Sequence, residues 1–299
     1  MRVGTRASAL ALAQAGTVAA LLGAGGDDVE LVRVTTTGDR DRGAAGVTDK
    51  ERWVKELELA LLDGEIDLAI HSAKDVPSVL PEGLELVGTP ARGDALDALV
   101  GAPSLAALPT GARVGTASLR RAAQLLALRE DLKIVVVRGN VDTRLRRLTD
   151  GDLDALVLAA AGLQRLGRSE AIGCLLDELV PAPGQGTLVL EARTGDERAA
   201  AAVAAIADAT AWATLLAERT CVAALDASCN TPLGVHAMVG AGGELVVQTF
   251  AGLPDGSHWI RDETPPVANP EEAGALAAER LLAAGAGELL AQAEELAAR

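Results

Sequence analysis

The sequence predicts an α/β fold that is divided into more than one domain. Short apolar runs alternate along the chain with Ala- and Leu-rich stretches whose apolar residues recur at helical spacing, a pattern typical of sheets that are covered by helices. The chain has 299 residues, of which 49% are hydrophobic. It is therefore long enough for two or three domains and has enough apolar material for a core in each.

The apolar runs are predicted to be strands, and the stretches between them helices. The predicted strands span residues 67–70, 84–87, 96–100, 134–137 and 155–158, and the predicted helices span residues 53–62 and 119–128. Residues 134–137 are apolar without interruption, as in strands that helices cover on both faces. We therefore expect mostly parallel sheets.

Proline and glycine mark the segments where the chain is expected to pass from one domain to the next. Residues 89–94 and 181–186 are such segments. Towards the C-terminus, the sequence predicts a strand over 244–250, a loop-rich stretch over 252–270 and a helix over 271–299 that two glycines interrupt. This order of elements indicates a smaller α+β domain.

Composition and charge argue against two classes of partner. The formal net charge is −15, so nucleic acids and anionic membranes repel the protein unless its basic residues are gathered in one patch. One Phe, three Trp and no Tyr leave few aromatic rings on which unpaired bases would stack. The sequence also lacks the roughly 18 consecutive apolar residues of a membrane span. We expect neither nucleic acid nor membrane as a partner.

The cysteines and histidines predict neither a disulfide framework nor a metal site. There are three of each, without a CxxC motif and without histidines at ligand spacing. They are Cys174, Cys221, Cys229, His71, His236 and His258. The N-terminal residues 1–22 mimic a signal peptide, but Gln14 and Thr17 interrupt their apolar stretch. We therefore expect a cytoplasmic protein.

Polar residues gather at the ends of apolar elements in five segments. In the first, Arg6 follows a strand and Ser8 opens a helix. This arrangement suits an anion site because a helix N-terminus offers free N–H groups; a plain N-cap beside a surface arginine is the alternative. In the second, Lys74 and Asp75 follow the strand 67–70, where α/β sheets bind ligands. A solvated ion pair is the alternative there.

The third and fourth segments, residues 114–121 and 137–145, place small or hydroxylated residues at strand-to-helix turns that are followed by arginines. With Arg165 after a similar element, the arginines are Arg120, Arg121, Arg138, Arg144 and Arg165. Because guanidinium groups pair bidentately with carboxylates, this array predicts a polyanionic ligand. In the fifth segment, residues 226–234, Cys229 is predicted to lie on a loop, either as a functional thiol or as a small buried side chain.

Together these segments resemble the hydroxymethylbilane synthase (porphobilinogen deaminase) family. The motifs that carry the resemblance occur in the family's order and are GTRxSxLALxQ, VKELExALLxGExDLAxHSxKDVP, VGTxSLRR, RGNVxTRLxxL, AGLxRL, PAPGQGxLxLE and CNTPLG. The resemblance implies two doubly wound α/β domains, like those of periplasmic binding proteins, and a small α+β C-terminal domain. The implied domains are 1–91 with 187–207, then 92–186, then 208–299.

The resemblance also implies the chemistry. Four porphobilinogen molecules would be condensed head-to-tail on a dipyrromethane primer, with release of linear hydroxymethylbilane and ammonia, in tetrapyrrole biosynthesis. Cys229 would hold the dipyrromethane through a thioether. Asp75, assisted by Lys74 and Arg6, would stabilise the cation formed when porphobilinogen loses ammonia.

Further roles follow from the resemblance residue by residue. The residues expected to contact the cofactor, besides Cys229, are Ser72, Lys74, Asp75, Thr116, Ser118, Arg120, Arg121, Arg138 and Gln185. The residues expected to bind substrate are Arg6, Ser8, Gln14, Lys50, Arg138, Arg144 and Arg165. No metal is implied, and a monomer is expected.

Two stretches depart from the family pattern. Residues 48–53 place charged residues around Lys50 where the family has a glycine-rich loop, and Ala227 and Ser228 stand where it has two glycines. The first change is expected to stiffen its loop and the second to alter the backbone before Cys229. Two alternatives stay open: a non-catalytic carboxylate-binding protein of the same architecture, and a family member that binds the cofactor without turnover.

Overall fold

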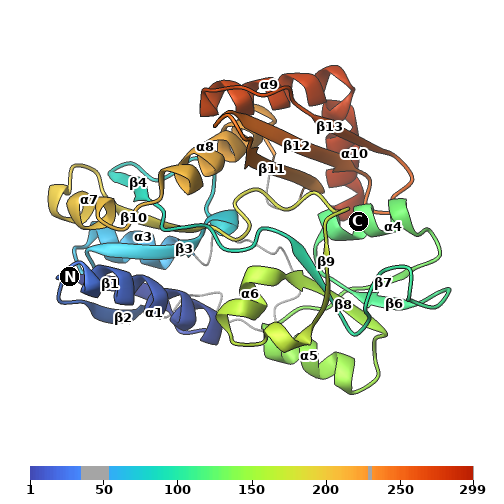
Figure 1. Cartoon of the computed structure of the whole chain (residues 1–299), viewed down its shortest axis with the longest axis horizontal. Coiled ribbons are helices and arrows are strands. Elements are labelled where there is room, and N and C mark those ends of the chain that lie inside the picture. Colours follow the sequence, from blue (N-terminus) through green and yellow to red (C-terminus); the bar gives the residue numbers. More distant parts are fainter. Residues whose placement is uncertain (35–53, 228–230, 299) are drawn as a thin grey trace. The chain divides into compact units, whose positions relative to one another are not determined.

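The computed structural model describes residues 1–34, 54–227 and 231–298. The chain divides into two compact units, one made of Met1–Gly93 and Gly186–Ala213 and the other of Asp94–Gln185 and Thr214–Arg299. Each unit contains a five-stranded sheet, and the second also contains a three-stranded sheet (Figure 1). The α/β class predicted from the alternation of elements is therefore confirmed.

The sheet of the first unit has the strand order β2-β1-β3-β10-β4. Its strands are β1 (Arg2–Arg6), β2 (Glu30–Val34), β3 (Leu68–Ser72), β4 (Leu84–Gly88) and β10 (Leu188–Arg193), and its helices are α1 (Ala9–Ala24), α3 (Lys55–Leu62) and α7 (Glu197–Ala204). β1 pairs in parallel with β2 and β3, whereas β10 runs antiparallel to β3 and β4.

Helices cover both faces of this first sheet. Val18 of α1 and Val203 of α7 share a buried core with Leu68 of β3. Leu57 of α3 lies in a second core together with Ala69, the next residue of β3. Successive side chains of a strand point to opposite faces, so Leu68 and Ala69 divide the two cores between them.

The second five-stranded sheet has the order β7-β6-β8-β5-β9. Its strands are β5 (Asp97–Val100), β6 (Arg113–Gly115), β7 (Lys133–Val135), β8 (Ala155–Ala159) and β9 (Ile172–Leu176), and its helices are α4 (Leu119–Leu128), α5 (Val141–Thr149) and α6 (Ala160–Arg165). β6 pairs in parallel with β7 and β8, whereas β5 runs antiparallel to β8 and β9. Leu125 of α4 packs with Val157 on one face, and Leu163 of α6 packs with Leu156 on the other.

The C-terminal part of the second unit is a small α+β layer. The antiparallel strands β11 (Leu233–Val239), β12 (Leu245–Gly252) and β13 (Trp259–Glu263) pack with α9 (Pro270–Ala283) and α10 (Ala286–Ala298). The helix α8 (Ala209–Ala224) enters this unit at Thr214. A Cβ atom on Gly274 of α9 would collide with the Ala217 carbonyl oxygen, so these two helices approach each other at a residue without a side chain.

No single helix in the described part of the chain has the length and apolar character of a membrane span. Two described helices, α7 and α8, pass that test when they are taken together, and they meet at a bend of 115°.

Three details of the sequence analysis are wrong. The sheets are mixed and not mostly parallel, because β5 and β10 each enter directly after a crossing segment and run against both neighbours. The apolar run 134–137 is not a covered central strand: β7 lies at a sheet edge, and Val136 is 62% exposed. Finally, the stretch 252–270 contains β13, whose alternating exposed residues gave it the polar composition of a loop.

Candidate functional site

The start of α1 lies directly after β1 and carries the first group of predicted site residues. Arg6 is the half-buried last residue of β1. Ser8 is the N-cap of α1, and its Oγ accepts a hydrogen bond from the Ala11 N–H at 3.2 Å. Gln14 is buried, and its Nε2 donates to the Ser72 Oγ at 2.9 Å. The structure thus brings Gln14 and Ser72 together and makes Gln14 a donor to a protein hydroxyl.

The predicted catalytic segment follows β3 without a gap. Ser72 ends β3, and Ala73–Asp75 form one turn of 3-10 helix. The Ala73 N–H donates to the Thr187 carbonyl at 3.0 Å, which ties this turn to the residue before β10. Lys74 and Asp75 are half-buried. The backbone of the segment is therefore held in place while both charged side chains keep access to solvent.

A buried pair that the sequence did not predict lies in the same sheet. His71 Nε2 and Glu191 Oε2 are 2.9 Å apart, and their side chains are 3% and 0% exposed. Val189 is opposite His71 in the β3–β10 ladder, and Glu191 is two residues further, so the pair is diagonal on one face. The two residues are 120 positions apart. No local sequence signal links them.

The second unit contains a buried carboxylate between two of the predicted arginines. Asp97, the first residue of β5, is fully buried. Its Oδ2 accepts from Arg120 Nη2 at 2.8 Å, and its Oδ1 accepts from Arg121 Nε at 2.9 Å and from Gln185 Nε2 at 2.9 Å. We call Asp97, Arg120, Arg121 and Gln185 the arginine cluster.

Asp97 is ionised within the arginine cluster. Burial by itself raises the pKa of this carboxyl, but the charges of Arg120 and Arg121, with hydrogen bonds from Arg121 and Gln185, outweigh burial and hold the pKa well below its usual range. Two guanidinium groups share this one carboxylate, and no other described acidic residue pairs with them. The cluster therefore carries an excess positive charge.

Arg120 and Arg121 are more deeply buried than ligand-binding arginines were expected to be. Their side chains are 4% and 8% exposed. Arg120 Nη1 donates to the Val180 carbonyl at 2.6 Å, and Arg121 Nη1 donates to the Val157 carbonyl at 3.1 Å. Asp97 is not predictable as a site residue from the sequence, because a single acidic residue at the start of an apolar strand gives no sign of a partner on a helix.

Thr116 and Ser118 order the turn from which α4 begins. Ser118 is the N-cap, and its Oγ accepts from the Arg121 N–H at 3.4 Å. Thr116 Oγ1 accepts from the Ser118 N–H at 3.2 Å. Both hydroxyls satisfy backbone donors at the start of the helix, so they support the turn of α4 that carries Arg120 and Arg121.

Three further predicted arginines lie near two helix ends. Arg138 and Arg144 lie before and within the first turn of α5, and Arg165 is the last residue of α6. Asn140 caps α5 by accepting from the Thr143 N–H at 2.8 Å, and Arg144 Nε donates to the Gly139 carbonyl at 2.9 Å. Burial lowers the pKa of Arg144, and the nearby charge of Arg121 lowers it further. Burial also lowers the pKa of Arg165, whereas Arg138 is exposed. Burial thus disfavours the charged forms of Arg144 and Arg165, although both residues remain partly exposed.

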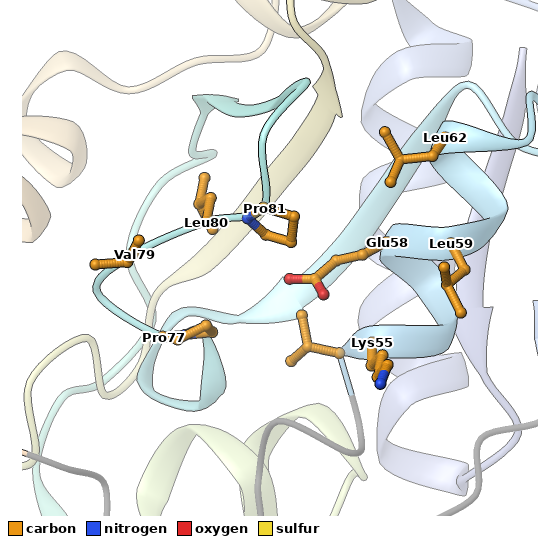
Figure 2. A pocket seen from close by; sticks show the side chains of 9 residues that line it. Lys55, Glu58, Leu59, Leu62, Pro77, Val79, Leu80 and Pro81 are labelled. Carbon is orange, nitrogen blue, oxygen red and sulfur yellow. The ribbon is translucent and has the colours of Figure 1, made fainter.

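A separate apolar pocket of about 430 Å³ in the first unit contains none of the predicted site residues. Figure 2 shows α3 on one side, with Leu59 and Leu62, and the stretch from Pro77 to Pro81 on the other. The Glu58 carboxylate points towards this space between them. One wall of the pocket, Pro77 to Pro81, follows the Ser72–Asp75 segment in sequence, but the mostly apolar lining differs from the polar side chains of that segment.

Known proteins match this chain over nearly its whole length. The family model "Porphobilinogen deaminase, dipyromethane cofactor binding domain" matches residues 1–201, and the model "Porphobilinogen deaminase, C-terminal domain" matches residues 212–283. This chain belongs to the porphobilinogen deaminase family. The porphobilinogen deaminase of Roseiflexus castenholzii is 46% identical, with 97% of this chain and 98% of that protein covered. That of Syntrophotalea carbinolica is 48% identical, with 97% and 95% covered.

Solved structures give a more distant match. The crystal structure of the methionine-binding protein MetQ is 18% identical, with a TM-score of 0.46, and the match covers 71% of this chain and 91% of that chain.

Membership in the porphobilinogen deaminase family confirms the predicted enzyme class, a transferase of the hydroxymethylbilane synthase type, and its dipyrromethane cofactor. Two residues of the predicted site, Lys50 and Cys229, lie outside the described residues. Burial raises the pKa of the Cys221 thiol to about 12 and also raises that of Cys174, so neither is a reactive thiolate. Among the described residues, no group of three His, Cys, Asp or Glu side chains is placed to hold a metal ion.

Proposed function

We propose that this porphobilinogen deaminase condenses four porphobilinogen molecules on a dipyrromethane held by Cys229, with Asp75 as its catalytic carboxylate and the arginines of the second unit as its carboxylate-binding groups. The observation that supports this proposal best is the excess positive charge of the arginine cluster. A ligand with several carboxylates supplies the anions that such a cluster lacks.

The residues of the second unit fit a dipyrromethane with acidic side chains. Arg121 and Arg144 are close enough for the charge of one to lower the pKa of the other, so a carboxylate near both would relieve their repulsion. Arg138 and Arg165 add guanidinium groups from the neighbouring turns. When bound, the dipyrromethane would supply the free pyrrole carbon to which the first unit is joined, and each later unit would be joined to the one before it.

Asp75 suits the stabilisation of positive charge on the substrate. When porphobilinogen loses ammonia, the bond between its methylene carbon and nitrogen breaks, ammonia leaves with the electron pair, and a cation remains. A carboxylate that is already oriented stabilises this developing charge without reorganising. The hydrogen bonds of Ala73 to Thr187 and of Gln14 to Ser72 hold the segment that carries Asp75.

The residues near the start of α1 have different roles in this proposal. Arg6 is half-buried at the end of β1 and is suited to bind a substrate carboxylate. Lys74, in the 3-10 turn after β3, offers a second cation. Ser8 orders the start of α1 as its N-cap. Gln14 supports the site indirectly, because its amide is bonded to Ser72.

Broader expectations complete the proposal. The chain is expected to be cytoplasmic and monomeric. We also expect neither nucleic acid nor membrane as a partner, because a net charge of −15 repels both. The division into domains 1–91 with 187–207, 92–186, and 208–299 is proposed as well. Separate folding of the last domain is testable by expressing residues 208–299 alone and measuring whether they unfold cooperatively.

The experiment that tests the proposed function is the intact mass of the purified protein, followed by an assay with porphobilinogen. We expect an excess mass of two linked pyrrole units, mapped to Cys229 by peptide analysis, and release of hydroxymethylbilane. Cys229→Ser should lack both the adduct and the activity. A chain that carries the adduct but makes no product would be a binding-only relative, and a chain that takes up no adduct even from porphobilinogen would refute the proposal.

A further inference from the structure

Gln124 makes an unusual pair of contacts on the buried side of α4. It is 3% exposed. Its Oε1 accepts from the Val180 N–H at 2.7 Å, and its Nε2 donates to the Val180 carbonyl at 3.0 Å. One side-chain amide therefore satisfies both polar groups of a residue 56 positions away. At neutral pH, where carboxyl groups are usually ionised, a side-chain amide is the group that offers a donor and an acceptor side by side in this way.

Val180 links the arginine cluster to the C-terminal layer. Its carbonyl also accepts from Arg120 Nη1 at 2.6 Å, and its side chain packs with Ala123 and Phe250. The next carbonyl, that of Pro181, accepts from the Val235 N–H of β11 at 3.0 Å. A displacement of the Val180 peptide would therefore disturb Arg120 on one side and β11 on the other.

The contacts of Arg120 show what depends on this peptide. Among the described residues, the Arg120 guanidinium group donates to two partners, the Val180 carbonyl and Asp97. Asp97 also accepts from Arg121. If the carbonyl turned away, Arg120 would lose one of these two hydrogen-bond partners, and the geometry of its hydrogen bond to Asp97 would change. The orientation of Arg121 would then change as well, because both guanidinium groups share the same carboxylate.

We propose that Gln124 is a positioning residue of this enzyme: by clamping the Val180 peptide it orients Arg120, Asp97 and Arg121 for the carboxylates of the cofactor and substrate. This inference rests on the proposed function of the arginine cluster. Gln124 itself is not expected to touch the ligand. It acts through the Val180 carbonyl, and its loss weakens ligand binding more than it weakens the fold.

The first test replaces the amide by an apolar side chain of similar length. Gln124→Met keeps the volume and removes both hydrogen bonds. We expect the rate at which the cofactor-free chain acquires the dipyrromethane from porphobilinogen to fall about tenfold, which corresponds to roughly 1.4 kcal/mol, and KM for porphobilinogen to rise by a similar factor. This acquisition of the cofactor, called loading below, is measured as the increase in the intact mass of the protein. The cofactor-free chain is produced in a host that makes no porphobilinogen.

The matched control is Gln248→Met on β12, in the same unit. The Gln248 Nε2 donates to the Glu263 Oε2 at 2.8 Å in an exposed contact. This control makes the same chemical change and loses a hydrogen bond, but it has no link to the arginine cluster. We expect loading and KM to stay at their wild-type values.

A second variant tests the need for both a donor and an acceptor. Gln124→Glu keeps the acceptor for the Val180 N–H but, when ionised, has no hydrogen to give to the Val180 carbonyl. Protonation restores a donor. At about pH 8 this variant should therefore load more slowly than the wild type. The ratio of the two loading rates should rise as the pH falls towards the pKa of the introduced carboxyl, which burial raises and the neighbouring Arg120 guanidinium group lowers. The Gln124→Glu variant also tests the inference if Gln124→Met does not fold.

The outcomes separate this inference from the proposed function. If the wild-type chain neither loads nor makes product, the proposed function fails, and this inference fails with it. If the wild type does both, and Gln124→Met melts at a lower temperature but loads at the wild-type rate per folded molecule, Gln124 is merely structural and the inference is overturned. If Gln124→Glu loads at the wild-type rate at about pH 8, where its carboxylate has no hydrogen to donate, the inference is overturned as well.

Discussion

The two five-stranded sheets share one strand pattern but hold different buried polar groups. In each, the fourth strand of the order, β10 or β5, runs antiparallel to both of its neighbours. Each of these strands carries a fully buried carboxylate, Glu191 in the first sheet and Asp97 in the second. Glu191 meets one histidine of the adjacent strand, whereas Asp97 meets two arginines of a helix.

This difference shows how one framework serves two purposes. The pair of His71 and Glu191 is matched one to one and lies within the sheet, next to the segment that presents Asp75. The arginine cluster has two cations for one anion, and arginine stays charged at any ordinary pH. These arrangements agree with the roles proposed above, Asp75 of the first unit towards a cation and the arginines of the second unit towards anions.

The largest expected effect comes from Asp97→Asn, which leaves Arg120 and Arg121 buried without a counter-charge. We expect the free energy of unfolding to fall by about 3–5 kcal/mol, measured by denaturant titration, whereas exposed Asp177→Asn in the same unit should change little. The folded-state pKa of Asp97 is lowered, so its contribution is complete at neutral pH and is lost as the pH falls through that pKa. The deficit of the variant should hold constant down to about pH 4. Wild-type stability in Asp97→Asn would contradict the assigned role of this carboxylate.

The next effect concerns Asp75, the carboxylate that the first sheet presents. Asp75→Asn should lower kcat by about 10²–10³-fold, because a neutral amide stabilises a developing cation poorly. The side chain is half-buried and not part of a core, so thermal stability should stay near that of the wild type. Asp63→Asn, at the exposed end of α3, is the control. A kcat close to the wild-type value would remove Asp75 from its catalytic role.

A smaller effect is expected for Arg144, which tests the anion-binding side of the comparison. Arg144→Leu should raise KM for porphobilinogen, or slow cofactor loading, by about tenfold to a hundredfold through the loss of charge-assisted hydrogen bonds. Arg147→Leu on the same helix is the matched control, because Arg147 pairs with Asp152 at 3.0 Å on the surface. Equal effects of the two variants would show that Arg144 acts only through general charge.

The smallest effect is expected for Glu191→Gln in the first sheet. An amide offers both an acceptor and a donor, so it can hydrogen-bond His71 Nε2 in either tautomer, and no arginine loses its counter-ion. We therefore expect a loss of only about 1–2 kcal/mol in the free energy of unfolding, measured as for Asp97→Asn. If the two amide variants are equally destabilised, the distinction between the sheets breaks down.

The predicted elements and the observed ones agree best where the signal is local. The strands predicted at 67–70, 84–87, 96–100 and 155–158 are confirmed as β3, β4, β5 and β8, and the helix predicted at 119–128 is α4. Ser118 and Asn140 cap their helices because short polar side chains satisfy the first N–H groups. Such features depend on a few neighbouring residues, and a sequence displays them directly.

The candidate site was predictable in part for the same reason. The polar residues of the Ser72–Asp75 segment and of the turns before α4 and α5 directly follow strands, so their clustering at sheet ends is visible in the sequence. The partners of these residues are not. Asp97 and Arg121 are 24 positions apart, and Gln124 and Val180 are 56 apart. Neither contact can be predicted from the apolar periodicity of the helix or strand that carries the residue.

The sequence by itself determined the alternation of strands and helices, the motifs that mark the family and the arginine-rich composition of the second unit, because apolar periodicity and turn residues act over a few positions. The tertiary structure alone decided which strands run antiparallel, that Arg120 and Arg121 share Asp97, and that Gln124 clamps Val180. These features arise when distant segments pack and their buried polar groups must find partners, since a buried group without one is costly.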